Sequence, residues 1–388
     1  MASRHETFSI RDELDSLAAN HLYRELRTVE VLGPTAKING KEVILLCSND
    51  YLGLSRNKQV ISSMVNSLKH GASQCSSRLV AGNDSMLERL ERDLAKHKGF
   101  ERAMIYPTGY MANIGVISSL AGKGDLVVSD EFNHASIVDA CKMSKADVSV
   151  FKHNDAKDLE SKLSVSGYRR KIAVVEGVFS MDGDLAILDE IGKISHGNDA
   201  LLILDDAHGD FVYGKHYRGT AEYLNVEKYV DVFVSSMSKA LGCFGGYVAS
   251  RKEIIEYLIN KSRSFIYTSA LPSAIASGAI TALQITKKGS LQKKLWKNVK
   301  QFRTGLIDMG LDIRSSSHII PVIVNDEKLA LRLSKLLLEH GVFAQAIRYP
   351  TVPKGSARIR VSITSMLDKH MDDAIEGFRR SAAKLNII

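Results

Sequence analysis

The sequence predicts an α/β protein in which a mostly parallel, seven-stranded sheet is followed by a smaller α+β domain. Between about residues 57 and 250, short apolar runs of strand length alternate with segments of helical periodicity. This alternation is typical of a parallel sheet with helices on both faces. After Pro272, two consecutive helical stretches precede further strand-like runs, which indicates a second unit. A chain of 388 residues, 45% of them apolar, is large enough for both.

The elements are expected in a definite order. Residues 10–30 are amphipathic and predict an N-terminal helix, and turn signals at Gly33-Pro34 and Asn39-Gly40 predict a small hairpin. The large sheet is expected to use the apolar runs at 103–106, 125–129, 148–151, 172–175, 201–204, 232–234 and 246–249. The second unit is expected to contain helices near 273–287, 290–309 and 326–340 and a final helix, with strands at 319–324, 342–347 and 357–363. We therefore divide the chain into an N-terminal segment (1–56), a large α/β domain (57–271) and a C-terminal α+β domain (272–388).

Composition argues against several classes of function. The net charge of +8 comes from scattered basic residues, so nucleic-acid binding is not expected, although surplus positive charge could attract a phosphorylated substrate. No apolar run reaches the roughly 18–20 residues that a membrane helix needs, and the start of the chain lacks the apolar core of a signal peptide. The four cysteines have no metal-binding spacing, so no metal site is expected. We expect a cytoplasmic enzyme.

Lys239 is the most informative residue. It lies five residues after the end of the apolar run 232–234 and precedes a glycine-rich turn. A desolvated lysine loses its charge readily, and a neutral amine can form a Schiff base with an aldehyde such as pyridoxal phosphate. An isolated Ser-Lys pair would more often be a surface lysine on a loop, so the functional interpretation depends on neighbouring motifs.

Those motifs lie at the ends of other strand-like runs. Asp205-Asp206-Ala207-His208 ends one run, where open α/β sheets bind ligands. A carboxylate there can bind a protonated pyridine nitrogen and a histidine can reach a ring hydroxyl, although a metal site or a helix cap would also fit. Ser180 follows another run and offers a hydroxyl. His134 opens a predicted helix and could either stack on a planar ring or cap the helix.

Four of these motifs, in this order, resemble the α-oxoamine synthases: Asn133-His-Ala-Ser136, Gly177-Val-Phe-Ser-Met-Asp-Gly183, Asp205-Asp-Ala-His-Gly209 and Ser235-Ser-Met-Ser-Lys-Ala-Leu-Gly242. The resemblance extends from Ser48-Asn-Asp-Tyr-Leu-Gly-Leu54 to Ala357-Arg-Ile-Arg360, nearly the whole chain. It implies pyridoxal 5'-phosphate as cofactor and the fold type I of aspartate aminotransferase. The implied activity is the decarboxylative condensation of an amino acid with an acyl-CoA to an α-amino ketone.

The resemblance also implies roles for individual residues. The backbone of Gly109 and Tyr110 and the hydroxyl of Ser236 would bind the cofactor phosphate, since the start of a helix is an anion site. Thr268 and Ser269 would reach that phosphate from a neighbouring subunit, which implies a homodimer with the site at its interface. Without the family, two hydroxyls before a proline would indicate a plain turn.

The implied catalytic residues are Lys239, which holds the cofactor and removes the α-proton, together with His134, Asp205 and His208. Ser180 would contact the cofactor as well. Arg358 and Arg360 share one face of a strand; this pattern is usually solvated, but the resemblance makes Arg360 bind the substrate carboxylate with the help of Asn49.

Local segments favour one branch of the family. Leu22-Tyr-Arg-Glu-Leu-Arg27 and Ala346-Ile-Arg-Tyr-Pro-Thr-Val-Pro353 resemble the branch that condenses L-alanine with pimeloyl-CoA in biotin biosynthesis, with Arg24 and Thr351 at the acyl substrate. Tyr349 departs from that branch and, with its neighbours, resembles the branch that joins glycine to acetyl-CoA. The segment Gly71–Ser77 is also poorer in glycine than usual.

Three alternatives stay open. The chain could be the glycine–acetyl-CoA ligase, or a non-catalytic partner subunit of the same fold, although such subunits typically lose the lysine. A dinucleotide-binding oxidoreductase is disfavoured because the glycines after Lys239 lack the Gly-x-Gly-x-x-Gly spacing. Sequence alone does not decide between coenzyme A and acyl carrier protein as the acyl carrier.

Overall fold

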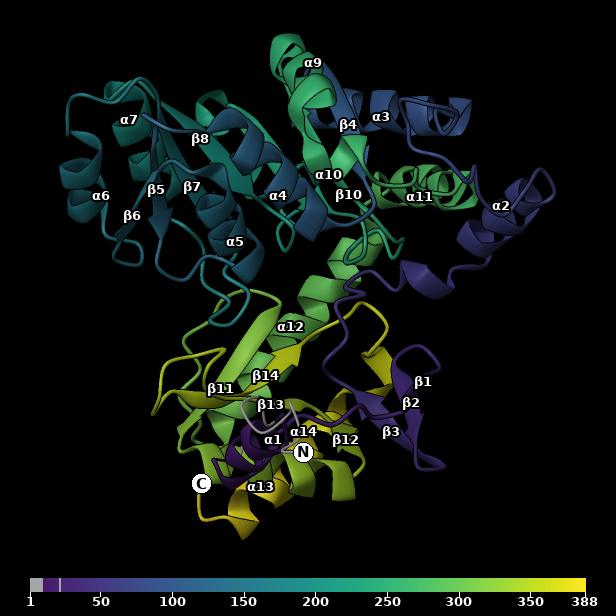
Figure 1. Ribbon diagram of the computed structural model, residues 1–388. Coiled ribbons are helices and arrows are strands. Elements are labelled where there is room, and N and C mark those ends of the chain that lie inside the picture. The colour runs from purple at the N-terminus through teal and green to yellow at the C-terminus, as the bar shows by residue number, and fades with distance from the viewer. Residues whose placement is uncertain (1–9, 21) are drawn as a thin grey trace, which may run out of the picture.

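The structure is a computed structural model that describes residues 10–20 and 22–388. Its centre is a seven-stranded sheet with the strand order β4-β10-β9-β8-β7-β5-β6 (Figure 1). The strands are β4 (Arg102–Tyr106), β5 (Leu126–Asp130), β6 (Asp147–Phe151), β7 (Lys171–Glu176), β8 (Ala200–Asp205), β9 (Val232–Ser236) and β10 (Gly246–Ser250). Only β10 runs against its neighbours. The predicted mostly parallel sheet is confirmed.

The strands bury both of their faces because their apolar side chains alternate between two cores. Ile172 and Val174 of β7 pack into one core, whereas Ala173 and Val175 pack into the other. The first core is closed by α4 (Gly109–Leu120), α5 (Ala135–Ser144), α9 (Lys252–Lys261) and α10 (Arg263–Ile266). The second core includes side chains of α2 (Lys58–Leu68), α3 (Ser85–Lys98), α6 (Ala156–Leu163), α7 (Leu188–Gly197), α8 (Thr220–Tyr223) and α11 (Ser273–Thr286).

A second body contains both the beginning and the end of the described chain (Figure 1). One of its sheets pairs β11 (Ile319–Asn325), β14 (Ala357–Ser362) and β13 (Gln345–Ile347). The other contains β1 (Glu30–Val31), β2 (Thr35–Ile38), β3 (Lys41–Leu45) and β12 (Val342–Phe343). The predicted hairpin is confirmed, since β2 and β3 pair antiparallel across Asn39-Gly40. Because β3 also pairs with β12, this hairpin lies with the C-terminal elements.

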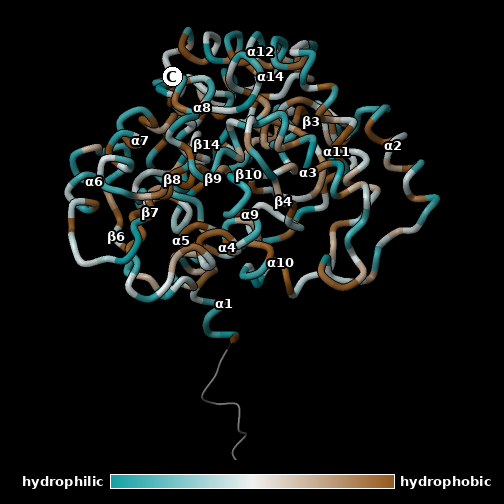
Figure 2. Tube along the Cα trace, turned by 90° about the horizontal axis from the view of Figure 1, so that it is seen from above, coloured by the Kyte–Doolittle hydropathy of each residue, from teal (hydrophilic) through white to brown (hydrophobic). Residues whose placement is uncertain are grey.

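Helices cover these small sheets. They are α12 (Ser290–Asp308), α13 (Glu327–Glu339) and α14 (Met371–Lys384), and short 3₁₀ turns lie at Leu54–Arg56, Glu227–Tyr229 and Asp368–His370. Figure 2 shows α12 and α14 along one edge of the molecule and α4, α9 and α10 along the opposite edge, with strands of the large sheet between them. No helix among residues 10–20 and 22–388 is both long and apolar enough to cross a membrane.

Two predicted elements are wrong. The N-terminal helix is α1 (Ile10–Ala19) and does not continue to residue 30. Residues 22–29 instead run without helical structure, and Arg27 places its guanidinium 5.3 Å from the centre of the Phe343 ring. The single strand predicted at 342–347 is divided at Ala344, because β12 pairs with β3 whereas β13 pairs with β14.

Candidate active site

A cavity of about 220 Å³ lies at the carboxyl ends of β7, β8 and β9. Its lining includes most of the residues predicted for cofactor binding, namely Gly109, Tyr110, His134, Asp205, His208, Ser236 and Lys239. Lys239 reaches this place because the chain reverses between the antiparallel strands β9 and β10. Gly242 makes the turn possible: its φ is +62°, and a Cβ there would lie 2.3 Å from the backbone nitrogen of Ser55.

The surroundings of Lys239 favour a neutral amine. Burial lowers the pKa of Lys239, and the carboxylates of Asp205 and Glu176 offset only part of this effect. An amine whose pKa is lowered in this way is a better nucleophile and base near neutral pH than an ordinary lysine. This direction of the Lys239 pKa is the one that the interpretation from the sequence requires.

Asp205 is held in a fixed orientation. Its Oδ2 accepts a hydrogen bond from Nδ2 of Asn113 at 2.6 Å, and its Oδ1 accepts one from the backbone N–H of Ala207 at 3.0 Å. Asn113 also donates to the hydroxyl of Ser136 at 2.9 Å. Sequence reasoning missed Asn113, although its place one turn after Gly109 at the start of α4 puts it on the same side of that helix.

Glu176 also lines the cavity and was missed. It ends β7 and is the register partner of Asp205 at the end of β8. Burial, reinforced by the negative charge of Asp205, raises the pKa of Glu176 well above its usual range. Its Oε1 has no hydrogen-bond partner among the residues that the structure describes. The sequence signal was present, since parallel strands that end together bring their last side chains to one edge.

The start of α4 lines the cavity of Lys239 through Thr108, Gly109 and Tyr110. The helix begins at Gly109, and the side chain of Thr108 caps it by accepting the N–H of Met111 at 3.1 Å. A Cβ on Gly109 would lie 3.1 Å from Cβ of Ser236, so glycine lets the first turn approach that hydroxyl. Backbone N–H groups beside a serine hydroxyl suit a phosphate. The cavity thus brings this helix start together with the amine of Lys239 and the carboxyl groups of Asp205 and Glu176.

His134 lies between this cavity and a larger one of about 950 Å³, because it lines both. The capping interpretation also holds: Nδ1 of His134 accepts the N–H of Ser136 at 3.2 Å at the start of α5. Ser180 and Thr351 line only the larger cavity of these two. Ser180 and Lys239 therefore line two different cavities, and His134 lines both of them.

A hydrogen-bonded chain joins the predicted carboxylate-binding residues to His208. Arg360 donates from Nε to the carbonyl of Ser180 at 2.5 Å and from Nη1 to Oδ1 of Asn49 at 3.3 Å. Oδ1 of Asn49 also lies 3.2 Å from the hydroxyl of Tyr51, and this hydroxyl lies 2.6 Å from Nδ1 of His208. Tyr51 was not predicted. Arg358, on the same strand, pairs instead with Asp182.

The remaining predicted residues lie elsewhere. Arg24 is exposed and lines a third cavity, of about 800 Å³, together with Thr351 and Tyr349. Tyr349 and Thr351 are the two residues that this cavity shares with the cavity at Ser180. Thr268 and Ser269 precede Ala270 and do not line the cavity of Lys239 in the same chain.

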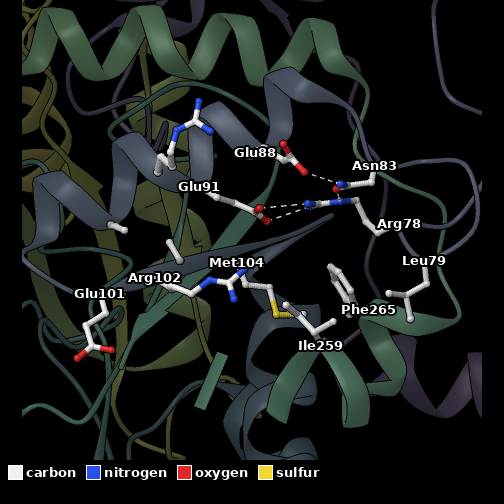
Figure 3. A pocket seen from close by; sticks show the side chains of 13 residues that line it. Arg78, Leu79, Asn83, Glu88, Glu91, Glu101, Arg102, Met104, Ile259 and Phe265 are labelled. Carbon is white, nitrogen blue, oxygen red and sulfur yellow. Dashed lines mark hydrogen bonds and ion pairs between the residues drawn. The ribbon is translucent and has the colours of Figure 1, made fainter. Parts of the chain in front are cut away.

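A fourth cavity, of about 460 Å³, contains none of the predicted site residues (Figure 3). It lies beside the edge strand β4, and Arg78 points there toward Glu91 with two contacts of 2.9 and 3.1 Å. These paired charges satisfy each other, so this cavity does not provide the reactive groups found around Lys239. Among the described residues, no group of three or more His, Cys, Asp or Glu side chains could hold a metal ion.

Comparison with known proteins agrees with this geometry. Residues 41–378 match the family model described as aminotransferase class I and II. The chain belongs to this family. The 8-amino-7-oxononanoate synthase of Thermoanaerobacter pseudethanolicus is 41% identical over 395 residues, covering 100% of both chains. The enzyme of that name from Bacillus subtilis is 37% identical over 98% of both chains.

Solved structures place this family member among the α-oxoamine synthases. Serine palmitoyltransferase of Sphingomonas wittichii superimposes with a TM-score of 0.93 over 100% of both chains, at 32% identity. A variant of the S. paucimobilis enzyme, solved with bound pyridoxal phosphate and myriocin, gives a TM-score of 0.92 at 29% identity over 100% of both chains. The predicted family and fold type are confirmed.

Proposed function

We propose that this protein condenses L-alanine with pimeloyl-CoA to 8-amino-7-oxononanoate, with release of coenzyme A and carbon dioxide, as a step of biotin biosynthesis. The observation that carries the proposal is the placement of Lys239, Asp205 and His208 in one cavity beside an anion-binding helix start. Full-length relatives named for this product support the choice of substrates. Four free cysteines are compatible with work in the cytoplasm.

Pyridoxal 5'-phosphate fits this cavity. When bound, it supplies an aldehyde for an amine and an aromatic ring that takes up the electrons released at the α-carbon. Gly109, Tyr110 and Ser236 would hold its phosphate, and Lys239 would be its covalent anchor. Asp205, kept in place by Asn113, would pair with the ring nitrogen, and His208 would hydrogen-bond to the ring. Glu176 would remain neutral beside them.

Different residues of the protein would bind the amino acid, position it and remove its α-proton. Arg360, with Asn49, would bind the α-carboxylate, and His134 would lie over the reacting centre. Nζ of Lys239 would accept the α-proton, because its lowered pKa favours the neutral form that can act as a base. Holding both substrates in adjoining cavities replaces a chance encounter with an oriented one.

The acyl substrate would occupy the larger cavities. Its thioester would lie near His134 and Ser180, where the 950 Å³ cavity begins. The chain would then pass Tyr349 and Thr351, which border both this cavity and the one at Arg24. Arg24, with Arg27 lining the same cavity, would pair with the far carboxylate of a pimeloyl group.

We also propose a homodimer in which Thr268 and Ser269 complete the partner's phosphate site. Large apolar side chains are exposed close to these residues, among them Val80 at 82% and Tyr267 at 72%. The backbone of Ala270 bonds to Ser76 at 2.8 Å, so the segments of Val80 and Tyr267 lie together. Contiguous exposed apolar surface commonly marks an interface. Sedimentation that gave a monomer in the presence of cofactor would contradict this part of the proposal.

A substrate panel tests the function. The purified protein would be given alanine, glycine or serine with pimeloyl-CoA, pimeloyl acyl carrier protein or acetyl-CoA, and free thiol would be measured. We expect the highest kcat/KM for alanine with a pimeloyl thioester. Preference for glycine with acetyl-CoA would transfer the assignment to the ligase branch, to which Tyr349-Pro350 also points. No thiol release with any pair, from a protein without bound cofactor, would favour a non-catalytic subunit.

A further inference from the structure

Tyr51 is the central member of the hydrogen-bonded chain that runs from Arg360 to His208. Its side chain is completely buried and lies outside the cavity of Lys239. Its hydroxyl accepts a hydrogen bond from Arg360, and it lies 2.6 Å from Nδ1 of His208 and 3.2 Å from Oδ1 of Asn49. A hydroxyl has one proton, so it can donate to only one of them. The choice decides which nitrogen of His208 carries hydrogen.

The distances favour donation to His208. The hydroxyl of Tyr51 lies 2.6 Å from Nδ1 of His208 but 3.2 Å from Oδ1 of Asn49, so its proton is better placed for His208. Oδ1 of Asn49 already accepts from Arg360 and does not need the Tyr51 proton. Burial raises the pKa of Tyr51 to about 12, so this proton stays on the tyrosine across the working pH range.

The charge state of His208 agrees with this arrangement. Burial, together with the nearby charges of Lys239 and Arg360, lowers the pKa of His208 well below its usual range. His318 and His134 also lower this pKa. Further ionisable groups in contact with His208 or in the same cavity are Tyr51, Asp205 and Glu176. A neutral imidazole whose Nδ1 accepts a hydrogen bond must carry its own hydrogen on Nε2.

We infer that Tyr51 is a positioning residue: its hydroxyl selects the tautomer of His208 that presents an Nε2–H donor to the cavity of Lys239. The inference rests on the proposed function, since this donor would serve the oxygen of the bound cofactor ring. Arg360 also donates a side-chain hydrogen bond to Tyr51, so the carboxylate site and the ring site share this hydroxyl as a support.

Replacement of Tyr51 by phenylalanine tests the inference. The variant keeps the ring, which packs edge-on against His318 at 4.1 Å between centres, and removes only the hydroxyl. Tyr213→Phe is the matched control, since Tyr213 is also buried and its ring lies 6.1 Å from that of His318. Both full-length variants would be loaded with pyridoxal phosphate. The visible absorbance of the bound cofactor would then be measured as a function of pH.

A donor at the ring oxygen stabilises its anionic form, so losing a fixed donor should raise the pH midpoint of this absorbance change. In Tyr51→Phe we expect a higher midpoint and a roughly tenfold lower kcat, with little change in KM for the acyl-CoA. Tyr213→Phe should behave as the wild type. A wild-type midpoint and kcat in Tyr51→Phe would overturn the inference.

A second measurement reads the tautomer directly. In the full chain labelled with ¹⁵N-histidine, the resonances of His208, identified by their loss in His208→Gln, should report Nε2–H in the wild type. Nδ1–H would overturn the inference even if Tyr51→Phe failed to fold. This readout needs no substrate. An Nε2–H tautomer in a protein that fails the substrate panel would leave the positioning role intact and reject only the proposed reaction.

Discussion

Glu176 and Asp205 are register partners at the ends of β7 and β8, yet their side chains have different hydrogen-bond partners. Asp205 receives hydrogen bonds on both oxygens, whereas Oε1 of Glu176 has no partner among the described residues. Burial and the nearby Asp205 raise the pKa of Glu176, which favours its protonated form. The shift at Glu176 limits the negative charge that gathers at this edge of the cavity.

This difference predicts opposite results for two amide substitutions. Glu176→Gln replaces a neutral acid with a neutral amide and should keep kcat within roughly fivefold of the wild type. Asp205→Asn removes the charge that would favour a protonated ring nitrogen and should keep the cofactor but lose most of the activity. Exchange of the α-proton of alanine in deuterated water is the measurement. Exchange at the wild-type rate in Asp205→Asn would contradict the role of Asp205.

The stability of the protein should also depend on Glu176. A carboxyl whose pKa is raised in the folded state binds its proton more tightly than in the unfolded chain. Its contribution to the free energy of unfolding is therefore complete below the unfolded pKa of about 4.3 and declines as pH rises. Glu176→Gln should abolish this component, and urea unfolding of both proteins between pH 4 and 8 would detect it. If the free energies of unfolding of the wild type and of Glu176→Gln changed with pH in the same way, Glu176 would not be protonated in the folded protein.

Lys239→Ala should abolish turnover, with a loss on the order of 10²–10⁴-fold or more, because it removes both the covalent anchor and the base. The fold should survive, since the lysine lines a cavity and does not belong to the apolar core. Mass spectrometry after borohydride reduction should find a pyridoxyl group on Lys239 of the wild type alone. A label on any other lysine would contradict the assignment.

Arg24→Ala should act selectively on the acyl donor. The guanidinium would pair with the far carboxylate of a pimeloyl group, but Arg24 is exposed in the chain described, so screening by water limits the effect to roughly fivefold or less in kcat/KM. Use of acetyl-CoA should not change. A far larger loss with pimeloyl-CoA would show that the cavity becomes closed to water, and an equal loss with both donors would exclude the proposed pairing.

His153 predicts an alkaline limit to stability. Its Nδ1 lies 3.0 Å from Asp130 and its Nε2 2.8 Å from Asp184. Burial alone lowers the pKa of His153, but the two carboxylates outweigh it and raise the pKa to about 10. Stability from this charge is complete below the unfolded pKa of about 6.5 and is lost as pH rises through about 10.

His153→Gln should therefore lower the free energy of unfolding most near pH 6, and the difference from the wild type should shrink toward pH 10. Thermal unfolding at several pH values measures it. His196→Gln is the control, because His196 is more exposed and contacts one carboxylate, Asp231, at 3.3 Å. A difference that stayed constant from pH 6 to 10 would mean that His153 supports the fold without its charge.

The sequence predicted the large sheet well because each of its strands is an apolar run bounded by turns, and Lys239, Asp205 and His208 follow such runs within a few residues. It failed where structure depends on distant partners. Residues 342–347 read as one strand, yet β3 and β14 pair with different parts of it. Tyr51 was missed for the same reason, since its role comes from a contact with His208 far along the chain. Glu176 was missed although its place at the end of a strand-like run carried a signal.

The pairing of β3 with β12 has a consequence for how the protein is made. Residues near 44 emerge early from the ribosome, but their strand partner at Val342 is synthesised about 300 residues later. Until then β3 has an unpaired edge, which is a site where chains can associate wrongly. The large domain can complete its sheet before Val342 is synthesised. During that time the nascent chain carries a nearly complete large domain and an N-terminal hairpin whose β3 edge is unprotected.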